Sequence, residues 1–454
     1  LFNNASAGTM VDNGGRTANT LASLNPNDIE SLVVLKDAAS TAIYGSRGAN
    51  GVVLITTKGG VAGSPIWSSA PKFELRTQMG VSGYAYNNLL QGLSGEQYHD
   101  YYIEARVNDG MSVSDAEADY LNQWPISQGV SNDWRDLMTR NGVTKQVDLS
   151  ATGGNDRFTY FISGGLMDQE GNIYEQFFKR YSSRINLTAR LTDKFTVANN
   201  LSVARTTQNG VADGSAWASV GYMVAFMPPV VPIKDEDGFW YHRHTNVMGA
   251  NHPLGNLYEN PQNRETSRVI ENLSGTYQFT DDLTFASTWS FDLYNIYDYV
   301  YWNPFFGDGR NSGGEFDDSR VNNLNWQGTQ TLSYQRLFSD IHNVDAVIGY
   351  EESQNDRKRT NVWGEGFAHP DLKQGTSAAI TEGTSTFDEY SFRSYFTRVN
   401  YDFDRTYFVS ASFRRDGSSR FGPDKRWGNF WALGGGITLT NMSFMQDFGV
   451  FDYL

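Results

Sequence analysis

The chain has 454 residues and a formal net charge of −15, and it contains no cysteine, so a disulfide framework, a zinc finger and a thiol nucleophile are excluded. The basic stripe that a nucleic-acid-binding protein needs is absent; an acidic, aromatic surface suits a neutral or cationic ligand, or only keeps long exposed loops soluble. Aromatic residues make up 14% of the chain and hydrophobic residues only 39%, a mixture typical of strands that alternate an apolar aromatic face with a polar one.

The first sixty residues contain a compact unit with two apolar segments. After an Asn-, Gly- and Thr-rich stretch up to about residue 24, β-branched runs at 29–35 and 52–57 flank an alanine-rich segment and the glycine-punctuated turn 44–51. This order predicts a strand, a short helix, a turn and a second strand. The turn glycines allow conformations that are closed to other residues. A soluble α/β domain is the alternative, but it would continue with further βα repeats, and none follow in the sequence.

Beyond a linker-like stretch at 61–71, the chain changes to strands with a period of two residues. In the clearest case an aromatic set, Phe285, Trp289 and Phe291, alternates with a hydroxyl-bearing set, Thr284, Thr288 and Ser290. Such alternation over roughly ten residues is typical of a transmembrane β-strand. We expect the aromatic set to face lipid and the hydroxyl-bearing set to face the lumen. About twelve strands are predicted, near 72–84, 143–154, 156–168, 176–191, 194–209, 264–280, 283–297, 319–338, 341–356, 386–403, 405–417 and 426–440.

The connections between these strands are of two kinds. Tight polar turns are predicted at 191–195, 280–283, 338–341 and 403–406, and long loops at about 85–142, 210–263, 298–318 and 358–385. Short turns on one rim and long loops on the other are typical of an outer-membrane barrel. Since no run of about 18 apolar residues predicts a membrane-spanning helix, a membrane protein with this sequence requires a closed sheet. In the first long loop, Ser94 and Gln97 have capping-box spacing and predict a helix, and a second short helix is predicted at 132–139.

The loop 297–306 is the most aromatic part of the chain. Aromatic rings form natural platforms for sugar rings or for peptide side chains. The candidate substrate contacts are Tyr299, Tyr301, Trp302, Phe305 and Phe306. The alternative is a packed loop cluster that touches a partner protein or another part of the fold.

Signals for catalysis or metal binding are weak. The segment 235–238 begins like a calcium loop but lacks the remaining ligands and the closing Glu. His242, His244 and His252 lie in a Gly- and Asn-rich loop without an orienting carboxylate, so we expect a solvated loop and not a metal site. The motifs GxSxG and HExxH and the P-loop are absent. We therefore expect no catalytic residue, no cofactor and no metal.

A second distinctive block covers residues 394–428. Its charged, Gly-containing stretch 414–422 is bracketed by aromatic residues and predicts a hairpin tip at a barrel rim; a basic, ligand-binding tip is the alternative. This block and residues 25–60 resemble signatures of the SusC-like TonB-dependent transporters of the Bacteroidota outer membrane. The block at 394–428 matches the barrel of that family, and residues 25–60 match its plug domain. The resemblance implies a structural role, with no chemistry, for the plug signature residues Asp28, Ile29, Glu30, Lys36, Asp37, Tyr44, Gly45, Arg47, Gly48 and Gly51.

The resemblance implies an all-β membrane protein: a transmembrane antiparallel barrel of 22 strands in the family, about twelve of them here, with a small α+β plug domain in the lumen. It divides the chain into the C-terminal part of the plug domain (1–60), a linker (61–71) and the N-terminal part of the barrel with its long extracellular loops (72–454). The TonB box, the N-terminal extension and the remaining strands of the family have no counterpart in the sequence. We therefore expect part of a longer protein, with two unpaired sheet edges.

The same resemblance implies TonB-dependent import of an oligosaccharide or a peptide across the bacterial outer membrane. The plug is the gate, a SusD-like surface lipoprotein is the lid, and the TonB–ExbB–ExbD complex pulls on a segment N-terminal to this chain; lipid surrounds the barrel, and nucleic acid is not a partner. The alternative is a barrel that serves as a structural or adhesive anchor or as a receptor without transport. Because a plug lies inside its barrel, Arg47 and Asp37 are expected to meet partners in the plug or on the inner wall.

Overall fold

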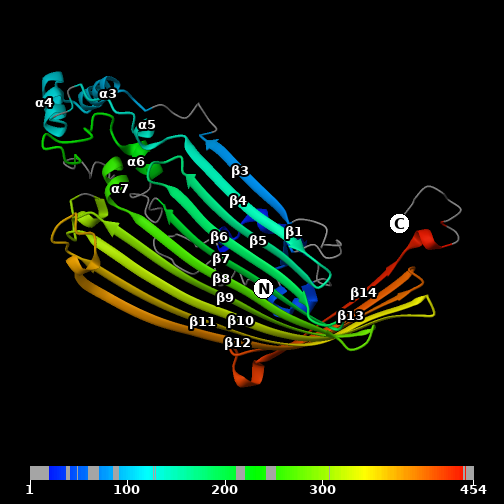
Figure 1. The fold of residues 1–454 in the computed structure, drawn as a ribbon. Coiled ribbons are helices and arrows are strands. Elements are labelled where there is room, and N and C mark those ends of the chain that lie inside the picture. The colour runs from blue at the N-terminus through cyan, green and yellow to red at the C-terminus, as the bar shows by residue number, and fades with distance from the viewer. Residues whose placement is uncertain are drawn as a thin grey trace.

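The computed structural model describes residues 20–36, 41–48, 50–59, 71–84, 92–125, 127, 129–210, 220–241, 252–305, 307–442 and 445. Its dominant element is one antiparallel sheet of twelve strands, in which each strand pairs with its neighbours in the sequence (Figure 1). The expected all-β fold with about twelve strands is confirmed. The strands are β3 (Lys72–Ser82), β4 (Gly142–Gly154), β5 (Phe158–Glu170), β6 (Phe177–Arg190), β7 (Phe195–Asn209), β8 (Gln262–Gln278), β9 (Leu283–Trp302), β10 (Glu315–Phe338), β11 (His342–Glu365), β12 (Ala379–Phe403), β13 (Tyr407–Ser418) and β14 (Trp427–Ile437).

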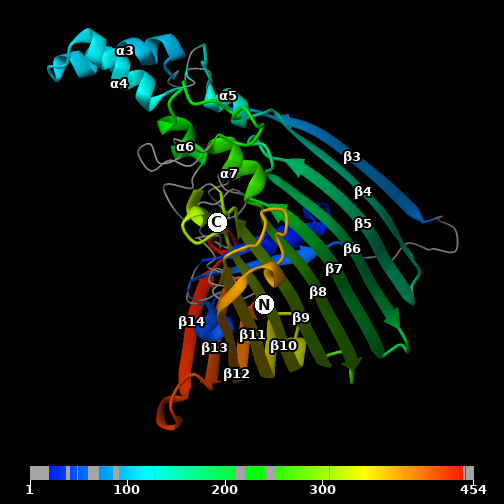
Figure 2. The same cartoon turned by 90° about the vertical axis from the view of Figure 1, so that its left-hand side faces the viewer.

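The sheet is open. Strands β3 and β14 form its two edges, and no pairing joins them in the ranges that the structure describes. The sheet is strongly curved, and the N-terminal segment lies on its concave side (Figures 1 and 2). We call the concave side the inner face and the convex side the outer face. The two unpaired edges expected from the sequence are present.

Four consecutive strands, β9 to β12, are longer than the sequence predicted. Strands β10 and β11 have 24 residues each and β12 has 25. At ~3.3 Å per residue such a strand spans about 80 Å, well beyond a hydrocarbon core of about 30 Å. Much of what was predicted as long loop at 298–318 and 358–385 is therefore strand. For β10 to β12 the error has a physical cause: a strand outside lipid needs no aromatic face, so the alternating pattern fades there.

The short turns at one rim fit tight hairpins. Ser339 and Asp340 between β10 and β11 have φ of 51° and 58°, and Asp404 and Arg405 between β12 and β13 have φ of 51° and 50°. Two consecutive residues with positive φ are the requirement of a type I′ turn, whose twist matches that of the strands it joins. The predicted tight turns at 338–341 and 403–406 are thus confirmed.

The helices lie at the opposite rim, in the long loops (Figure 1). The predicted capping box is present at the start of α3, where Gln97 N donates to Ser94 Oγ at 3.1 Å and Ser94 N donates to Gln97 Oε1 at 2.9 Å. The second predicted helix is α5, whereas α4, α6 and α7 were not predicted. Within the described ranges, no helix has the length and apolar character needed to cross a bilayer. The helices are α3 (Gly95–Asn108), α4 (Val113–Gln123), α5 (Trp134–Met138), α6 (Val220–Phe226) and α7 (Pro253–Glu259), and short 3₁₀ turns are η5 (Gly307–Arg310), η6 (Gly375–Ser377), η7 (Pro423–Lys425) and η8 (Leu439–Asn441).

The helical loops share a small hydrophobic core, which includes Trp134, Met138, Met223 and Leu254. His252 is fully buried beside this core, accepts a hydrogen bond from Gly255 N at 3.0 Å as the N-cap of α7, and makes an edge contact with the ring of Trp134. The expectation of a solvated loop is therefore wrong for His252, because capping and ring packing hold it inside. His242 and His244 lie outside the described residues.

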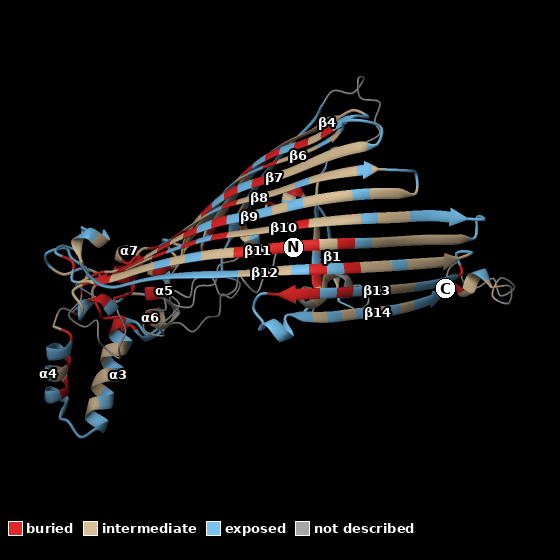
Figure 3. Ribbon diagram, turned by 90° about the horizontal axis from the view of Figure 1, so that it is seen from below, coloured by how far each residue is buried: buried red, intermediate tan, exposed pale blue. Residues whose placement is uncertain are grey.

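The two faces of the sheet differ as predicted. Phe285, Trp289 and Phe291 lie on the outer face and are 36%, 40% and 41% exposed. The alternate residues of β9, which include Thr284, Thr288 and Ser290, share the face of Asp292, which pairs with Arg268 of β8; Arg268 Nη1 in turn donates to Ser23 Oγ of the N-terminal segment at 3.2 Å. Buried and exposed positions alternate along the strands in the same way (Figure 3).

The N-terminal segment forms a small unit of η1 (Thr20–Ser23), η2 (Pro26–Asp28), β1 (Ile29–Leu35), η3 (Ala42–Gly48) and β2 (Val52–Thr57). Strands β1 and β2 pair antiparallel, and the predicted helix and turn between them correspond to the 3₁₀ segment η3 in the residues described. We call residues 20–59 the N-terminal unit. A unit of this size rarely holds a stable core alone, and Leu32, Val33 and Val34 are exposed on it. Contacts with the sheet must therefore hold it in place.

Candidate functional site between the N-terminal unit and the sheet

A buried ion-pair network joins the N-terminal unit to the inner face of the sheet. Arg47 of η3 donates through Nη1 to Gln327 Oε1 at 3.1 Å and through Nη2 to Glu351 Oε1. From β13, Arg414 donates through Nη2 to the same oxygen of Glu351 at 2.8 Å and through Nε to Asp416 Oδ1 at 2.6 Å. We call these five residues, Arg47, Gln327, Glu351, Arg414 and Asp416, the central cluster.

Strand register explains how Arg414 on β13 reaches Glu351 on β11 across the intervening β12. Phe396 of β12 lies opposite Arg414, and the guanidinium carbon of Arg414 lies 5.4 Å from the centre of the Phe396 ring. The ring itself covers Gly349, where a Cβ would lie 2.5 Å from Phe396 Cε2. Because Gly349 has no side chain, Phe396 lies over the strand and carries Arg414 toward Glu351.

Glu351 is the hub of the central cluster. It accepts hydrogen bonds from both guanidiniums and, through Oε2, from Gln327 Nε2 at 3.0 Å. Two arginines balance two carboxylates, and the Glu351 side chain is only 7% exposed. Charges so far from water are stable only while each keeps its partners. The complete central cluster therefore holds the N-terminal unit firmly to the sheet. Loss of one charged member leaves a buried charge without its partner and destabilises this contact.

Gly45 is required for this packing. Its φ of 59° and ψ of −141° lie in a region that is essentially closed to residues with a side chain. A Cβ at this position would also come within 2.8 Å of Arg414 Nε and closer still to Asp416 Oδ2. The glycine of the turn thus lets the backbone of η3 lie directly on the ion pair of β13.

Gly45→Ala is expected to loosen η3 from β13. The strained backbone alone costs about 1–3 kcal/mol, and the added methyl group displaces the Arg414–Asp416 pair. Hydrogen exchange of residues 41–48 in the full-length protein should become faster. Gly59→Ala is the matched control, since a Cβ there meets no atom within 4 Å. Equal exchange in the two variants would contradict the role given to Gly45.

A second polar network holds the start of the N-terminal unit against β4 to β6. Asp148 of β4 accepts from Asn25 Nδ2 at 2.6 Å and from Asn27 Nδ2 at 2.7 Å. Asp28 accepts from Ser163 Oγ at 2.7 Å and pairs with Arg184 Nε at 3.5 Å. We call these six residues the lateral cluster. The N-terminal unit is thus held on both sides of the concave face, by β4–β6 and by β10–β13.

The plug signature residues divide into contacts and exposed positions. Arg47 meets inner-wall partners as predicted, whereas Asp37 lies outside the described residues. Asp28 is buried in the lateral cluster, Glu30 and Lys36 are exposed, and Ile29 and Tyr44 are half-buried. Gly48 is buried and Gly51 has a φ of 87°. The structural role that the resemblance gives these residues in a plug remains a prediction.

The aromatic candidates of loop 297–306 are mostly engaged within the protein. Tyr301 is fully buried against Phe316 and Phe367, with its hydroxyl donating to Pro370 O at 3.0 Å, and the Tyr299 hydroxyl donates to Lys373 O. Trp302 is half-buried, Phe305 is 56% exposed, and Phe306 lies outside the described residues. The packed cluster that the sequence left open as an alternative is present, and contact with a cargo remains a prediction for which Phe305 is the exposed candidate.

Sequence reasoning missed the partners that the sheet supplies. Glu351, Gln327 and Asp148 carry no motif, and Arg414 and Asp416 were assigned only to a hairpin tip. Arg414 does occupy the polar set of the alternation in 407–417, which was the available signal. The rest of the block behaves as expected for a rim, where Arg420 lies 3.9 Å above the ring of Tyr390. Among the described residues, no three His, Asp or Glu side chains are grouped as a metal site requires.

Known proteins resemble this chain over nearly its whole length. Residues 2–52 match the model of the TonB-dependent receptor plug domain. A TonB-dependent receptor of Formosa agariphila is 28% identical over 450 residues, which cover 97% of this chain and 41% of that relative. The TonB-dependent receptor SusC of Bacteroides thetaiotaomicron is 28% identical over 477 residues, covering 98% of this chain and 44% of SusC. The chain thus spans about two fifths of the length of these curated relatives.

Solved structures show the same architecture. The RagAB peptide transporter superposes with a TM-score of 0.80 at 25% identity, covering 95% of this chain and 51% of that chain. The ferric citrate transporter FecA superposes with a TM-score of 0.51 at 9% identity, a likeness of fold alone. In fold, the twelve-stranded sheet and the N-terminal unit therefore correspond to part of a barrel with its plug.

Proposed function

We propose that this chain, a SusC/RagA-like TonB-dependent receptor of the bacterial outer membrane, forms part of the barrel and of the gating plug of an active nutrient importer. The observation that carries the proposal is the central cluster, a buried ionic contact between Arg47 of the N-terminal unit and Glu351 of the sheet. A passive anchor or adhesin has no need of an ionic contact that fixes a separate unit inside its concave face.

The central cluster is suited to a contact that opens and closes again. When Arg47 is withdrawn, Arg414 remains hydrogen-bonded to both Glu351 and Asp416, so neither carboxylate is left without a cation. Removing a partner from an isolated buried ion pair costs about 3–5 kcal/mol. The shared arginine lowers that cost on the sheet side, and the sheet stays in place while the N-terminal unit moves.

The remaining parts of the importer follow from the resemblance to relatives. We propose that residues 1–60 belong to the plug domain, 61–71 to a linker and 72–454 to the barrel. In this proposal a SusD-like lipoprotein covers the outer side, TonB–ExbB–ExbD pulls on the plug, and the cargo is an oligosaccharide or a peptide. RagAB, whose structure superposes well, is a peptide transporter, which favours a peptide as the first cargo to test.

Import by the full-length receptor tests this proposal. Cargo that co-purifies with the receptor is identified by mass spectrometry, labelled and offered to cells. We expect uptake that falls to background when TonB is deleted or when the proton gradient is collapsed. Binding at the surface without uptake in energised cells would instead support a receptor or an adhesive anchor.

A further inference from the structure

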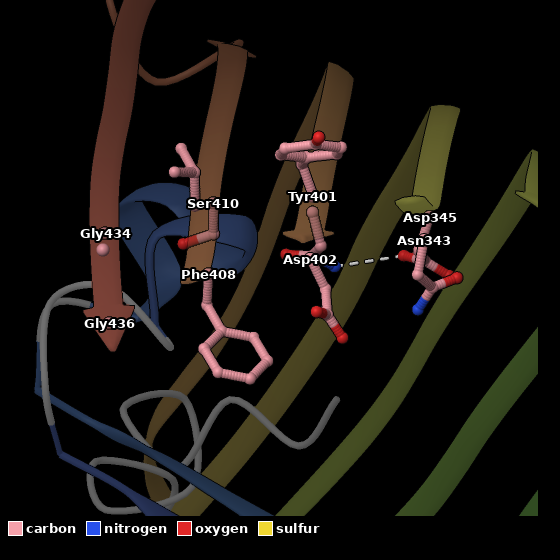
Figure 4. A pocket seen from close by; sticks show the side chains of 11 residues that line it. Asn343, Asp345, Tyr401, Asp402, Phe408, Ser410, Gly434 and Gly436 are labelled. Atoms are coloured by element: carbon pink, nitrogen blue, oxygen red, sulfur yellow. Dashed lines mark hydrogen bonds between the residues drawn. The ribbon is translucent and has the colours of Figure 1, made fainter. Parts of the chain in front are cut away.

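The inner face of the sheet contains a hollow of about 400 Å³ across β11 to β14 (Figure 4). Strand register arranges its lining in two rows. One row runs Asn343, Asp402, Phe408 and Gly436, and the next runs Asp345, Asn400, Ser410 and Gly434. Its volume is in the range of pockets that take small ligands, about 300–1,000 Å³.

Two glycines of β14 keep the hollow open. Gly434 and Gly436 lie opposite Ser410 and Phe408, so the last strand contributes no side chain to this part of the inner face. A Cβ at Gly434 would approach Ser410 Oγ to 2.7 Å, whereas one at Gly436 would meet its nearest atom, Phe408 Cβ, at an ordinary 3.8 Å. A larger residue at position 436 would therefore extend into the hollow without a clash at its base.

The hollow lies on the same face as the central cluster and nearer to the short turns. Asp345 and Ser410 are each separated by six residues from Glu351 and Asp416, which is about 20 Å along a strand. An even separation keeps all four side chains on one face. Segment η3 packs on β13 and β14 between the helical loops and the hollow. A cargo that passes η3 along these strands reaches the hollow next.

The chemistry of the lining favours a cation. Two carboxylates, two amides and the hydroxyl of Ser410 line the hollow, Tyr401 also borders it, and no Lys, Arg or His is among its lining residues. Asp345 Oδ1 accepts from Asn400 Nδ2 at 3.0 Å, the bond drawn in Figure 4, and the nearby Arg398 donates to Asn400 Oδ1 at 3.1 Å.

Asp402 differs from Asp345 because one of its carboxylate oxygens receives no hydrogen bond from the described residues. Its Oδ1 is buried and has no hydrogen-bond partner in the part of the chain that the structure describes. A buried carboxylate oxygen without a donor is costly, and a charged donor offsets that cost better than a neutral hydroxyl does. Asp345 and Asp402 lie diagonally on neighbouring strands, close enough for one ammonium group to lie between them.

We propose that this hollow is an exit-side binding site for a protonated amine of the cargo, such as the amino terminus or a lysine side chain of a peptide. The inference rests on the proposed import function and narrows its cargo to a peptide with a cationic group. The carboxylates of Asp345 and Asp402 hold the amine, and Phe408 supports its aliphatic part.

Chemical labelling of Ser410→Cys in the full receptor tests the site without requiring transport. These 454 residues contain no cysteine, so the new thiol is the single label position in them. We compare the reaction rates of a cationic and an anionic methanethiosulfonate reagent with this thiol. The ratio of the cationic to the anionic rate should be about tenfold higher than the same ratio in the Asp345→Asn/Asp402→Asn background. The Glu352→Gln control, whose carboxylate lies on the outer face with Arg393, should leave the ratio unchanged.

Protection against labelling identifies the ligand class. The tripeptide Ala-Lys-Ala should slow the reaction, whereas its fully acetylated form and maltotriose should not. Equal protection by maltotriose would replace the amine site with a site for neutral sugars and overturn the proposal. A thiol that reacts with neither reagent, or with both at the ratio seen in the double Asn background, would also overturn it.

A filling variant and an uptake assay complete the test. Gly436→Leu should slow labelling by both reagents and abolish protection, because its side chain occupies the hollow. Protection by Ala-Lys-Ala without TonB-dependent uptake would support the site and contradict the import function. Uptake of lysine peptides that is unaffected by the double Asn substitution would support import and contradict the site.

Discussion

Replacing Glu351 by alanine is expected to weaken the attachment of the N-terminal unit to the sheet by about 3–5 kcal/mol. The substitution removes the acceptor that Arg47 and Arg414 share at a position where the carboxylate is only 7% exposed. Arg414 keeps Asp416, but among the described residues the partner that remains for Arg47 is the neutral amide of Gln327. Two buried guanidiniums therefore lie beside one carboxylate, and the unit is released more readily than the sheet unfolds.

Hydrogen exchange of η3 and protease sensitivity of the N-terminal unit measure this effect in the full receptor. Glu352→Ala is the matched control, since Glu352 is the next residue of β11, faces outward and pairs with Arg393 at 3.3 Å in an exposed position. An exposed pair contributes about 0–1 kcal/mol. The anchoring role of Glu351 is refuted if the two variants expose the N-terminal unit to the same extent. In cells, Glu351→Ala should also admit large hydrophilic antibiotics that the control excludes.

The two anchoring clusters differ in a way that bears on the proposed role of the N-terminal unit as a gate. In the lateral cluster, Asn25, Asn27 and Asp28 all come from a short stretch that includes η2 and hold to β4, β5 and β6. In the central cluster, Arg47 of η3 makes the contacts that the described residues show, to Gln327 and Glu351. A pull that rotates η3 away from β13 breaks these bonds of Arg47 while the lateral cluster still holds. We therefore expect opening to begin over β10–β13.

Much of the fold could be predicted because the alternation of side chains follows directly from strand geometry. The strands 195–209 and 283–302 carry that alternation, and it also placed Trp289 on the correct face. The extensions of β10 and β11 were missed because they lie beyond the aromatic band, where either face tolerates polar residues. His252 was misjudged because its burial comes from Trp134, a residue far away in the sequence.

Of the candidate site, only the residues in the N-terminal unit could be predicted from the sequence, and their partners on the sheet could not. Glycines and an arginine in a turn indicate a constrained contact, so Gly45 and Arg47 were accessible from the sequence. Their partners were not, because Glu351 and Arg414 lie more than three hundred residues from Arg47 and are brought together by the register of strands β11, β12 and β13. Register across a sheet depends on every turn between its strands, and no local pattern encodes it.

Replacing Trp289 by arginine is expected to destabilise the sheet in a lipid bilayer by about 2–4 kcal/mol, the range for a cation on the lipid face near the midplane. Trp289 is on the outer face and stacks on Trp326 with ring centres 6.0 Å apart. Its ring also covers Gly328, where a Cβ would lie 2.7 Å from Trp289 Cζ3. Arginine loses that packing and places a charge against hydrocarbon, so the unfolding free energy in phospholipid vesicles should fall.

Asn295→Arg on the same strand is the control that separates lipid from loss of packing. Asn295 shares the outer face with Trp289 but lies six residues closer to the rim that carries the helical loops. A cation near the interface costs only about 0–1 kcal/mol, because the guanidinium reaches water and headgroups. Trp289→Phe removes the indole contact without adding a charge. It should lower the free energy of unfolding less than Trp289→Arg does. If arginine costs the same at 289 and 295, this stretch of the outer face does not lie at the depth of a bilayer midplane, and the assignment of the aromatic set to lipid is wrong.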